Sequence, residues 1–453
     1  MSPLKQFSPE VRRVVRVDLV VTVLLTGFAS LTGPFTGLML RTELGATPFQ
    51  LSVMASAGAA FMLSSLLWAR LVEGRRPLAY VVWAGFIGRG LFLFVPFVEY
   101  AWQMVAILVL ANFIGTMAAP ASTMLVERIY PKDQRGRALG VVRSAGAVPA
   151  IILLLGSGTL IGAISYRWAF VAAALLGMAA SLQQLRLPVP DAPAAPPVRP
   201  AGLMTAWAAL RDDRAFRRLM IASCVFGSGI WIQMPAHPVL MADVLKISTA
   251  QAGTFAAVAA VAAFVGNRVW GRLTDRWGAR RVLAIVYFVG ALTPMVDVFV
   301  TTPSVLVVSY VCDALMTTGL DLVLMLAIID TAGRQQTARY AAIASTLGGL
   351  RGIVAPLAGA AIIEYAGVRV VYAVASALMI AGGLVVLWQL RTRTAPLPSA
   401  QRSSQDGGLA ATGPCGMSRL VASRLGTGRQ TPRVSSLLDG GGPPSISDRA
   451  CRS

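Results

Sequence analysis

Histidine and cysteine are nearly absent from this sequence. Its 453 residues include one histidine, His237, and four cysteines whose spacing matches no zinc site. Two of the cysteines, Cys224 and Cys312, fall within apolar runs, so no disulfide framework is indicated. The chain also has no glycine-rich phosphate loop and no Ser/His/Asp pattern. These absences predict a protein that is not an enzyme, with no catalytic residues, no metal and no cofactor.

Charged residues are scarce as well. They make up 13% of the chain, against about a quarter in soluble proteins, and the mean hydropathy is +0.67. This composition predicts a protein embedded in a lipid bilayer. A net charge of +20 would suggest nucleic acid in a soluble chain, but here the basic residues follow the membrane topology. No nucleic-acid partner is expected.

Long apolar runs dominate the sequence, and each is near the length of about 20 residues that a helix needs to cross a bilayer. They predict an all-α membrane protein with twelve transmembrane helices in two six-helix bundles. The proline-rich segment Pro188–Pro200 separates the bundles as a semi-rigid linker, and 203–214 should form an amphipathic helix on the membrane surface. The expected spans are 17–40, 49–72, 78–98, 102–126, 138–160, 166–187, 217–243, 249–270, 282–300, 303–328, 340–364 and 367–390.

The chain therefore divides into five segments. A polar lead covers 1–16, the first bundle 17–187, the linker 188–216, the second bundle 217–391, and a tail rich in Ser, Gly, Pro and Arg 392–453. The tail is expected to be disordered. The first apolar run is too long for a cleavable signal peptide, and it has no clear cleavage site.

Lysine and arginine are concentrated on one side of the predicted membrane. The loops on the other side contain only Arg41, Arg167, Lys246 and Arg369. By the positive-inside rule, the lead, the linker and the tail are predicted to be cytoplasmic, with the chain in an inner or plasma membrane.

A short basic loop, Gly271–Arg281, connects the eighth and ninth spans. Gly271 would allow close helix packing, Asp275 can pair with an arginine or cap a helix, and Gly278 allows the chain to reverse. The pattern Gly-x-Leu-x-Asp-Arg-x-Gly-x-Arg-Arg resembles the signature loop of the major facilitator superfamily of transporters. The resemblance implies a gate that holds the two bundles together in one conformation and releases them in another. Its residues here are Gly271, Asp275, Arg276, Gly278, Arg280 and Arg281.

The two halves of the chain repeat at an offset of 201–202 residues, so that Pro34 corresponds to Pro235 and Arg167 to Arg369. Such a repeat is typical of transporter folds. The first-half copy of the basic loop is shorter and begins with alanine in place of glycine, although it keeps Glu73, Arg75 and Arg76. We therefore expect the gate in the second half to be the stronger one.

Ionisable residues inside the spans are costly, at about 2.5–3.5 kcal/mol each, so they should face water or a partner. In the resembled fold, spans one, four, seven and ten line the cavity. Asp313 lies near the middle of span ten, opposite Asn112 on span four, and Asp321 continues its face. Asp313 could be a cavity carboxylate for a proton or a cation, or a structural partner of Arg351. The other candidates for binding protons or substrate are Arg89, Arg351, Trp231, Gln233 and His237.

Together these features predict secondary transport of a small molecule by alternating access. We expect proton-coupled efflux of a small amphipathic compound by a monomer in the lipid bilayer, with Asp313 as the coupling carboxylate. Two alternatives stay open. One is uptake of an organic anion, with Arg89 and Arg351 as charge partners, and the other is a membrane sensor that does not transport.

Overall fold

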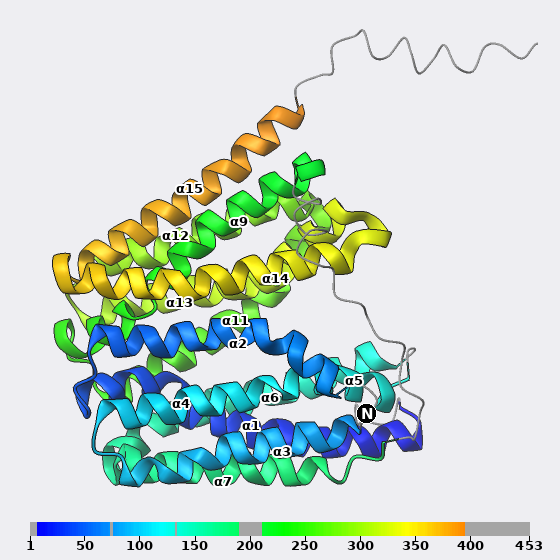
Figure 1. Cartoon of the computed structure of the whole chain (residues 1–453), viewed down its shortest axis with the longest axis vertical. Coiled ribbons are helices and arrows are strands. Elements are labelled where there is room, and N and C mark those ends of the chain that lie inside the picture. The colour runs from blue at the N-terminus through cyan, green and yellow to red at the C-terminus, as the bar shows by residue number, and fades with distance from the viewer. Residues whose placement is uncertain (1–6, 73–75, 132–133, 190–210, 395–453) are drawn as a thin grey trace, which may run out of the picture. The chain divides into compact units, whose positions relative to one another are not determined.

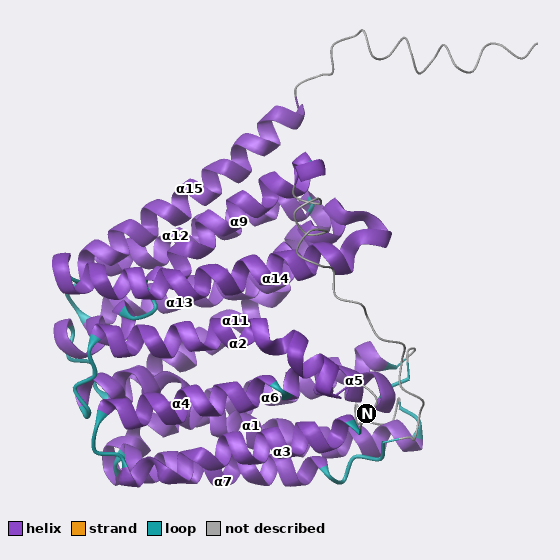
Figure 2. Ribbon diagram, viewed as in Figure 1, coloured by secondary structure: helices purple, strands orange, loops and turns teal. Residues whose placement is uncertain are grey.

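A computed structural model describes residues 7–72, 76–131, 134–189 and 211–394. Nearly all of these residues are helical, and the described ranges contain no strand (Figure 2). Ten segments are long and apolar enough to cross a membrane, and two further helices, α2 and α7, complete the twelve that were predicted. The prediction of an all-α, multi-pass membrane protein is confirmed. Residues 395–453 of the predicted tail and most of the predicted surface helix lie outside the described residues, whereas 392–394 are helical.

The first six spans form one bundle. Its first helix begins where Ser8 accepts a hydrogen bond from the Val11 N–H and Pro9 takes a position that needs no donor. The elements in chain order are α1 (Pro9–Thr42), α2 (Pro48–Val72), α3 (Pro77–Gly90) with η2 (Leu91–Phe97), α4 (Ala101–Thr116) with α5 (Ala118–Ile129), α6 (Arg135–Ile164) and α7 (Tyr166–Gln184).

The second bundle follows the same plan (Figure 1). Asp213 starts it by accepting hydrogen bonds from the Ala215 and Phe216 N–H groups at 2.8 and 3.0 Å. Its elements are α9 (Arg214–Ile232) with α10 (Ala236–Val239) and η3 (Leu240–Val244), α11 (Thr249–Trp277), α12 (Ala279–Phe299), α13 (Pro303–Gly319) with η4 (Leu320–Leu324), α14 (Met325–Ala366) and α15 (Val368–Thr394).

Helix α14 belongs to two spans. A straight helix of its 42 residues would be about 63 Å long, roughly twice the hydrocarbon thickness. The chain therefore reverses within it, and the two candidate spans are Pro303–Thr331 and Tyr340–Ala366. The predicted loop between spans ten and eleven is thus helical in its backbone.

Three sets of helices join the two bundles. Helix α1 contacts α10, η3 and α11, α2 packs along α14, and α6 packs along α11. The sequence repeat relates span one to span seven, and it exchanges the α2–α14 pair with the α11–α6 pair. The interface therefore follows a pseudo-two-fold axis between the halves, as the repeat predicts.

The bundles are closed together on one side of the membrane. We call the side where α1 begins and α15 ends the termini side, and the opposite side the far side. On the far side, Gly158 lies against the Thr249 carbonyl, and a Cβ at Gly253 would be 2.6 Å from the Leu154 carbonyl oxygen. Gly37 meets the Pro238 ring in the same way. Small residues of this kind let transmembrane helices approach closely.

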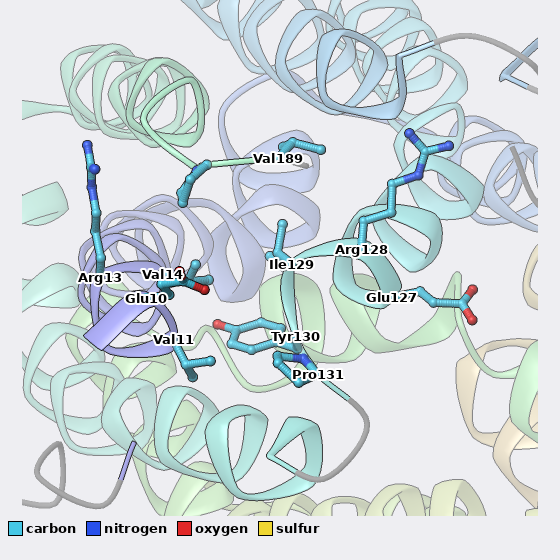
Figure 3. Close-up of a pocket in the computed structure, with 11 residues that line it drawn as sticks. Glu10, Val11, Arg13, Val14, Glu127, Arg128, Ile129, Tyr130, Pro131 and Val189 are labelled. Atoms are coloured by element: carbon cyan, nitrogen blue, oxygen red, sulfur yellow. The ribbon is translucent and has the colours of Figure 1, made fainter. Parts of the chain in front are cut away.

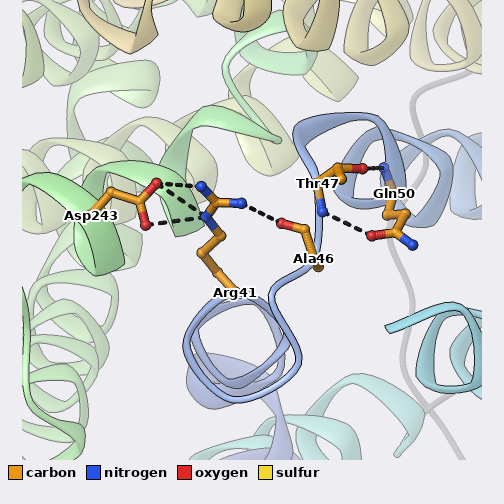
Figure 4. A network of polar contacts seen from close by, with 5 residues as sticks. All are labelled: Arg41, Ala46, Thr47, Gln50 and Asp243. Carbon is orange, nitrogen blue, oxygen red and sulfur yellow. Dashed lines mark hydrogen bonds and ion pairs between the residues drawn. The ribbon is translucent and has the colours of Figure 1, made fainter. Parts of the chain in front are cut away.

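An ion pair between Arg41 and Asp243 spans the bundles at this far end (Figure 4). The Arg41 Nε lies 3.1 Å from each Asp243 carboxylate oxygen, and Nη2 lies 2.6 Å from Oδ2. The third nitrogen, Nη1, donates to the Ala46 carbonyl at 2.7 Å. The two residues are 202 positions apart, which matches the repeat offset, so they meet at the pseudo-two-fold axis. We call this pair the far-side latch.

Replacing Arg41 by Gln should favour opening of the far side. Because the pair is partly exposed, it should contribute about 0.2–1 kcal/mol, or up to roughly fivefold in the ratio of closed to open molecules. Double electron–electron resonance measures the distance between spin labels at Glu99 and Glu364, one on each bundle. The proportions of short and long distances give that ratio. Lys246→Gln removes a nearby exposed charge and should change nothing, and the swap of Arg41→Asp with Asp243→Arg should restore closure. Unchanged distances in Arg41→Gln would show that the latch has no conformational role.

Candidate functional site

Span seven is broken in its far half. Helix α9 ends at Ile232, the chain turns, and α10 resumes at Ala236 before passing into the π-helical turn η3. Pro235 and Pro238 have no N–H to donate, so each removes a backbone hydrogen bond from this part of the span, and the helix is interrupted just before Pro235. The break places the side chains of Gln233 and His237 at the wall of a cavity.

This cavity has a volume of about 440 Å³, within the range of about 300–1,000 Å³ for small-molecule sites. We call it the far-half cavity. Helix α1 contributes mostly small residues to it, among them Gly33, Pro34 and Gly37. The second bundle contributes the polar side chains Gln233, His237, Thr293, Asp297, Ser309, Tyr310, Asp313 and Tyr372. Three of the residues predicted from the sequence, Asp313, Gln233 and His237, are therefore brought together.

Asp313 lies on α13 with an exposed side chain. One helical turn away, the Tyr310 hydroxyl lies 3.1 Å from Nε2 of His237 and donates to the Met241 sulfur at 3.4 Å. Because the hydroxyl hydrogen of Tyr310 is used in the bond to sulfur, its oxygen can accept a hydrogen bond from the protonated Nε2 of His237. His237 thus makes a structural hydrogen bond to Tyr310 at the cavity wall.

Asp297 is a second carboxylate in the same cavity, and sequence analysis did not identify it. It lies on α12, is 1% exposed, and its Oδ1 has no hydrogen-bond partner among the described residues. Ser309, from α13, lies beside it. Asp297 is on span nine, whereas the cavity was predicted to be lined by spans one, four, seven and ten. The available signal was a lone carboxylate inside an apolar run.

The remaining polar candidates do not line the far-half cavity. Asn112 is exposed on α4, where its Nδ2 donates to the Leu108 carbonyl at 2.9 Å. Asp321 is exposed in η4, nearer the termini side. Trp231 packs against Gly352, where an added Cβ would be 3.0 Å from the indole. These three side chains are therefore not among the residues that line the far-half cavity with Asp313.

The two arginine candidates, Arg89 and Arg351, are half-buried and are held within their own bundles. Arg89 donates to the Ser181 hydroxyl at 2.7 Å and to the Gly177 carbonyl at 3.4 Å. Arg351 donates to the Ser223 carbonyl and lies against Gly227. Glycines thus make room for both guanidinium groups. The described contacts include no pair between Arg351 and Asp313.

The gate loop is not engaged through Asp275 in this conformation. Asp275 and Arg276 are exposed, and Asp275 makes no ion pair with a described residue. The expected close packing at Gly271 is not seen either, because nothing lies within 4 Å of an added Cβ there. Gly278 does reverse the chain, with a φ of +82°. Of the remaining gate residues, Arg280 donates to the Thr331 hydroxyl at 2.8 Å, Arg281 and Arg76 are exposed, and Glu73 and Arg75 lie outside the described residues.

A second cavity, of about 700 Å³, lies in the first bundle at the termini side (Figure 3). The ring of Tyr130 reaches from the end of α5 toward α1, and its hydroxyl donates to Asp18. Burial, together with the Asp18 carboxylate, raises the pKa of Tyr130. This hydrogen bond ties the end of span four to span one.

The family model described as Major Facilitator Superfamily matches the chain twice, over residues 19–234 and 219–429. A comparison with curated proteins gave no match.

Several solved transporter structures are similar. A bacterial homologue of the human lysosomal transporter Spinster, inward-facing and occupied, is 13% identical with a TM-score of 0.64, over 85% of this chain and 98% of that one. A mutant of the nucleoside transporter NupG is also 13% identical, with a TM-score of 0.68 over 83% and 99%. A POT family transporter in complex with 5-aminolevulinic acid is 12% identical, with a TM-score of 0.66 over 84% and 96%.

These likenesses agree with the twelve helices, the repeat and the gate loop. The chain belongs to the major facilitator superfamily and is a membrane transporter, not an enzyme.

Proposed function

We propose that this transporter exports a small amphipathic compound in exchange for protons, and that Asp313 is the coupling carboxylate. The observation that carries this proposal is the position of Asp313 on the wall of the far-half cavity, where it has no arginine partner among the described residues. None of the described residues that line the cavity is Lys or Arg.

The coupling follows from the cost of charge in a membrane. A carboxylate in the hydrocarbon region is stabilised when a proton or a cationic group neutralises it. If proton and substrate compete for Asp313, only the neutralised forms change conformation readily, and the two fluxes become coupled. The two halves would then rock around the cavity and open it to each side in turn.

We further propose that both termini are cytoplasmic, in an inner or plasma membrane, because the Lys/Arg bias places the termini side in the cytoplasm. The far-side closure would then face outward, and this conformation would load substrate from the cytoplasm. Since one chain contains both bundles and the cavity, the proposed unit is a monomer.

The contacts of Arg89 and Arg351 weigh against uptake of an organic anion. Each guanidinium group is bound to backbone or hydroxyl oxygens of its own bundle, and neither lines the cavity. Asn112 on α4 and Asp321 in η4 are exposed, and we propose that substrate meets them on its way to Asp313. A membrane sensor that does not transport would not need the polar side chains that line the far-half cavity.

The loop Gly271–Arg281 is proposed to close the termini side when the far side opens, and to be the stronger of the two copies. Asp275→Asn removes a charge that can pair with arginine or cap a helix, which should cost about 1–3 kcal/mol in the closed form. Uptake of ethidium into inverted vesicles should fall sharply at normal expression, and Glu73→Gln should have a smaller effect. Equal losses from the two substitutions would contradict the asymmetry.

Asp313→Asn tests the coupling. The amide keeps size and hydrogen bonding but fixes the neutral state, so ethidium exchange across proteoliposomes should survive while uphill movement driven by a pH gradient disappears. Glu364→Gln, an exposed carboxylate on the same bundle, is the matched control and should retain gradient-driven transport. Full gradient-driven transport by a well-expressed Asp313→Asn protein would refute the role of this carboxylate.

A further inference from the structure

Unsatisfied polar atoms gather in the far-half cavity. Eight buried side-chain atoms of the described residues have no hydrogen-bond partner, and four of them belong to residues that line this one cavity. They are Gln233 Oε1, Thr293 Oγ1, Asp297 Oδ1 and Tyr372 OH. Buried polar groups are nearly always paired, so a cluster of unpaired ones indicates that something else completes it.

The unpaired atoms have a surplus of acceptors. A carboxylate oxygen and an amide oxygen can only accept, while the two hydroxyls can do either. Asp313 adds further acceptor oxygens to the same wall, and no Lys or Arg is found among the lining residues that the structure describes. His237 does not fill this need, because its Nε2 already faces Tyr310. The described lining therefore offers more acceptors than donors and includes no Lys or Arg.

Its other surfaces are apolar or aromatic. The rings of Tyr310 and Tyr372 face the cavity together with Leu38, Ile230 and Met241. Aromatic faces attract cations, and apolar side chains bind a hydrocarbon body. The cavity thus matches a molecule with one charged, donor-rich end and one apolar end.

We propose that the far-half cavity binds a small organic cation whose charged end carries N–H donors, a primary ammonium or an amidinium group, on an apolar body. Asp297 is the carboxylate that receives these N–H groups, and Gln233 Oε1 is a second acceptor. This inference rests on the proposed export function and adds the chemical class of the substrate.

The two carboxylates differ in exposure, and we assign cation binding to Asp297 and proton exchange to Asp313. Asp297 is 1% exposed, and a charge-assisted hydrogen bond is strongest in such a dry site. Asp313 is exposed at the same wall, where it can exchange protons with water. Both carboxylates line the same cavity, so a cation bound at Asp297 would repel a proton on Asp313 and favour its release.

Matched probes on the wild-type protein test the class directly. The probes are benzylamine, phenethylamine and naphthylmethylamine, each with its N-acetyl derivative and with a carboxylate of the same apolar body, and tetraethylammonium as a cation without N–H donors. Calorimetry and the thermal midpoint of purified protein report binding. We expect the amines to bind at least tenfold more tightly than their neutral or anionic partners and than tetraethylammonium. If no amine binds, or if the neutral partners bind equally well, the assignment of a cation site is wrong.

Two variants locate the site. Asp297→Asn should weaken amine binding at least tenfold. Gln233→Met should weaken it severalfold, and this variant serves as the test if Asp297→Asn does not fold. Glu364→Gln should leave binding unchanged. Wild-type affinity in a folded Asp297→Asn protein, or in Gln233→Met where only that variant folds, would overturn the assignment.

Failure of this inference can be told apart from failure of the proposed function. Amine binding without transport driven by a pH gradient would support the cation site and refute proton coupling. Gradient-driven export of a neutral or anionic compound, with no amine binding, would support coupled export and refute the cation site.

Discussion

The contact between Arg41 and Asp243 marks the constraint on which the described conformation depends, the closure of the two bundles at the far side. The pair lies where the ends of spans one and seven meet, at the pseudo-two-fold axis. Around it, Gly37, Gly158 and Gly253 bring helices of opposite bundles into contact. With the far ends held together, α1 becomes one wall of the far-half cavity.

The same closure explains why the gate loop is exposed. In a transporter of two rocking bundles, contacts on one side are made while those on the other are released. Here the far-side latch is formed, while Asp275 is exposed and the space beside Gly271 is open. The balance between the conformations then depends on small differences between the two sets of contacts, which ligands and protons can shift.

The sequence was sufficient for the fold because its signals are long and repeated. Apolar runs fixed the spans, and the offset between Pro34 and Pro235 predicted two related bundles. The candidate site was predicted only in part. Asp313, Gln233 and His237 were found because they lie on spans expected to face the cavity. Asp297 was missed because only the packing of α12 against α13 brings span nine to the same wall.

Other features of the site also depended on tertiary contacts. Arg89 and Arg351 were ambiguous in sequence, since a buried arginine can hold either substrate or its own backbone. Their partners, Ser181 and the Ser223 carbonyl, lie on helices that are far away in the sequence, so they could not be assigned without the fold. The far-side latch was hidden for the same reason, because Arg41 was counted only among the loop charges and Asp243 is the last residue of the predicted span 217–243.

Reciprocal motion of the two sides is the central claim, and paired distance measurements test it most directly. Spin labels at Glu99 and Glu364 report the far side, and labels at Leu185 and Asp330 report the termini side. As pH and amine concentration are varied, the account predicts that whenever the far-side distance lengthens, the termini-side distance shortens. Two distances that change independently, or lengthen together, would contradict it.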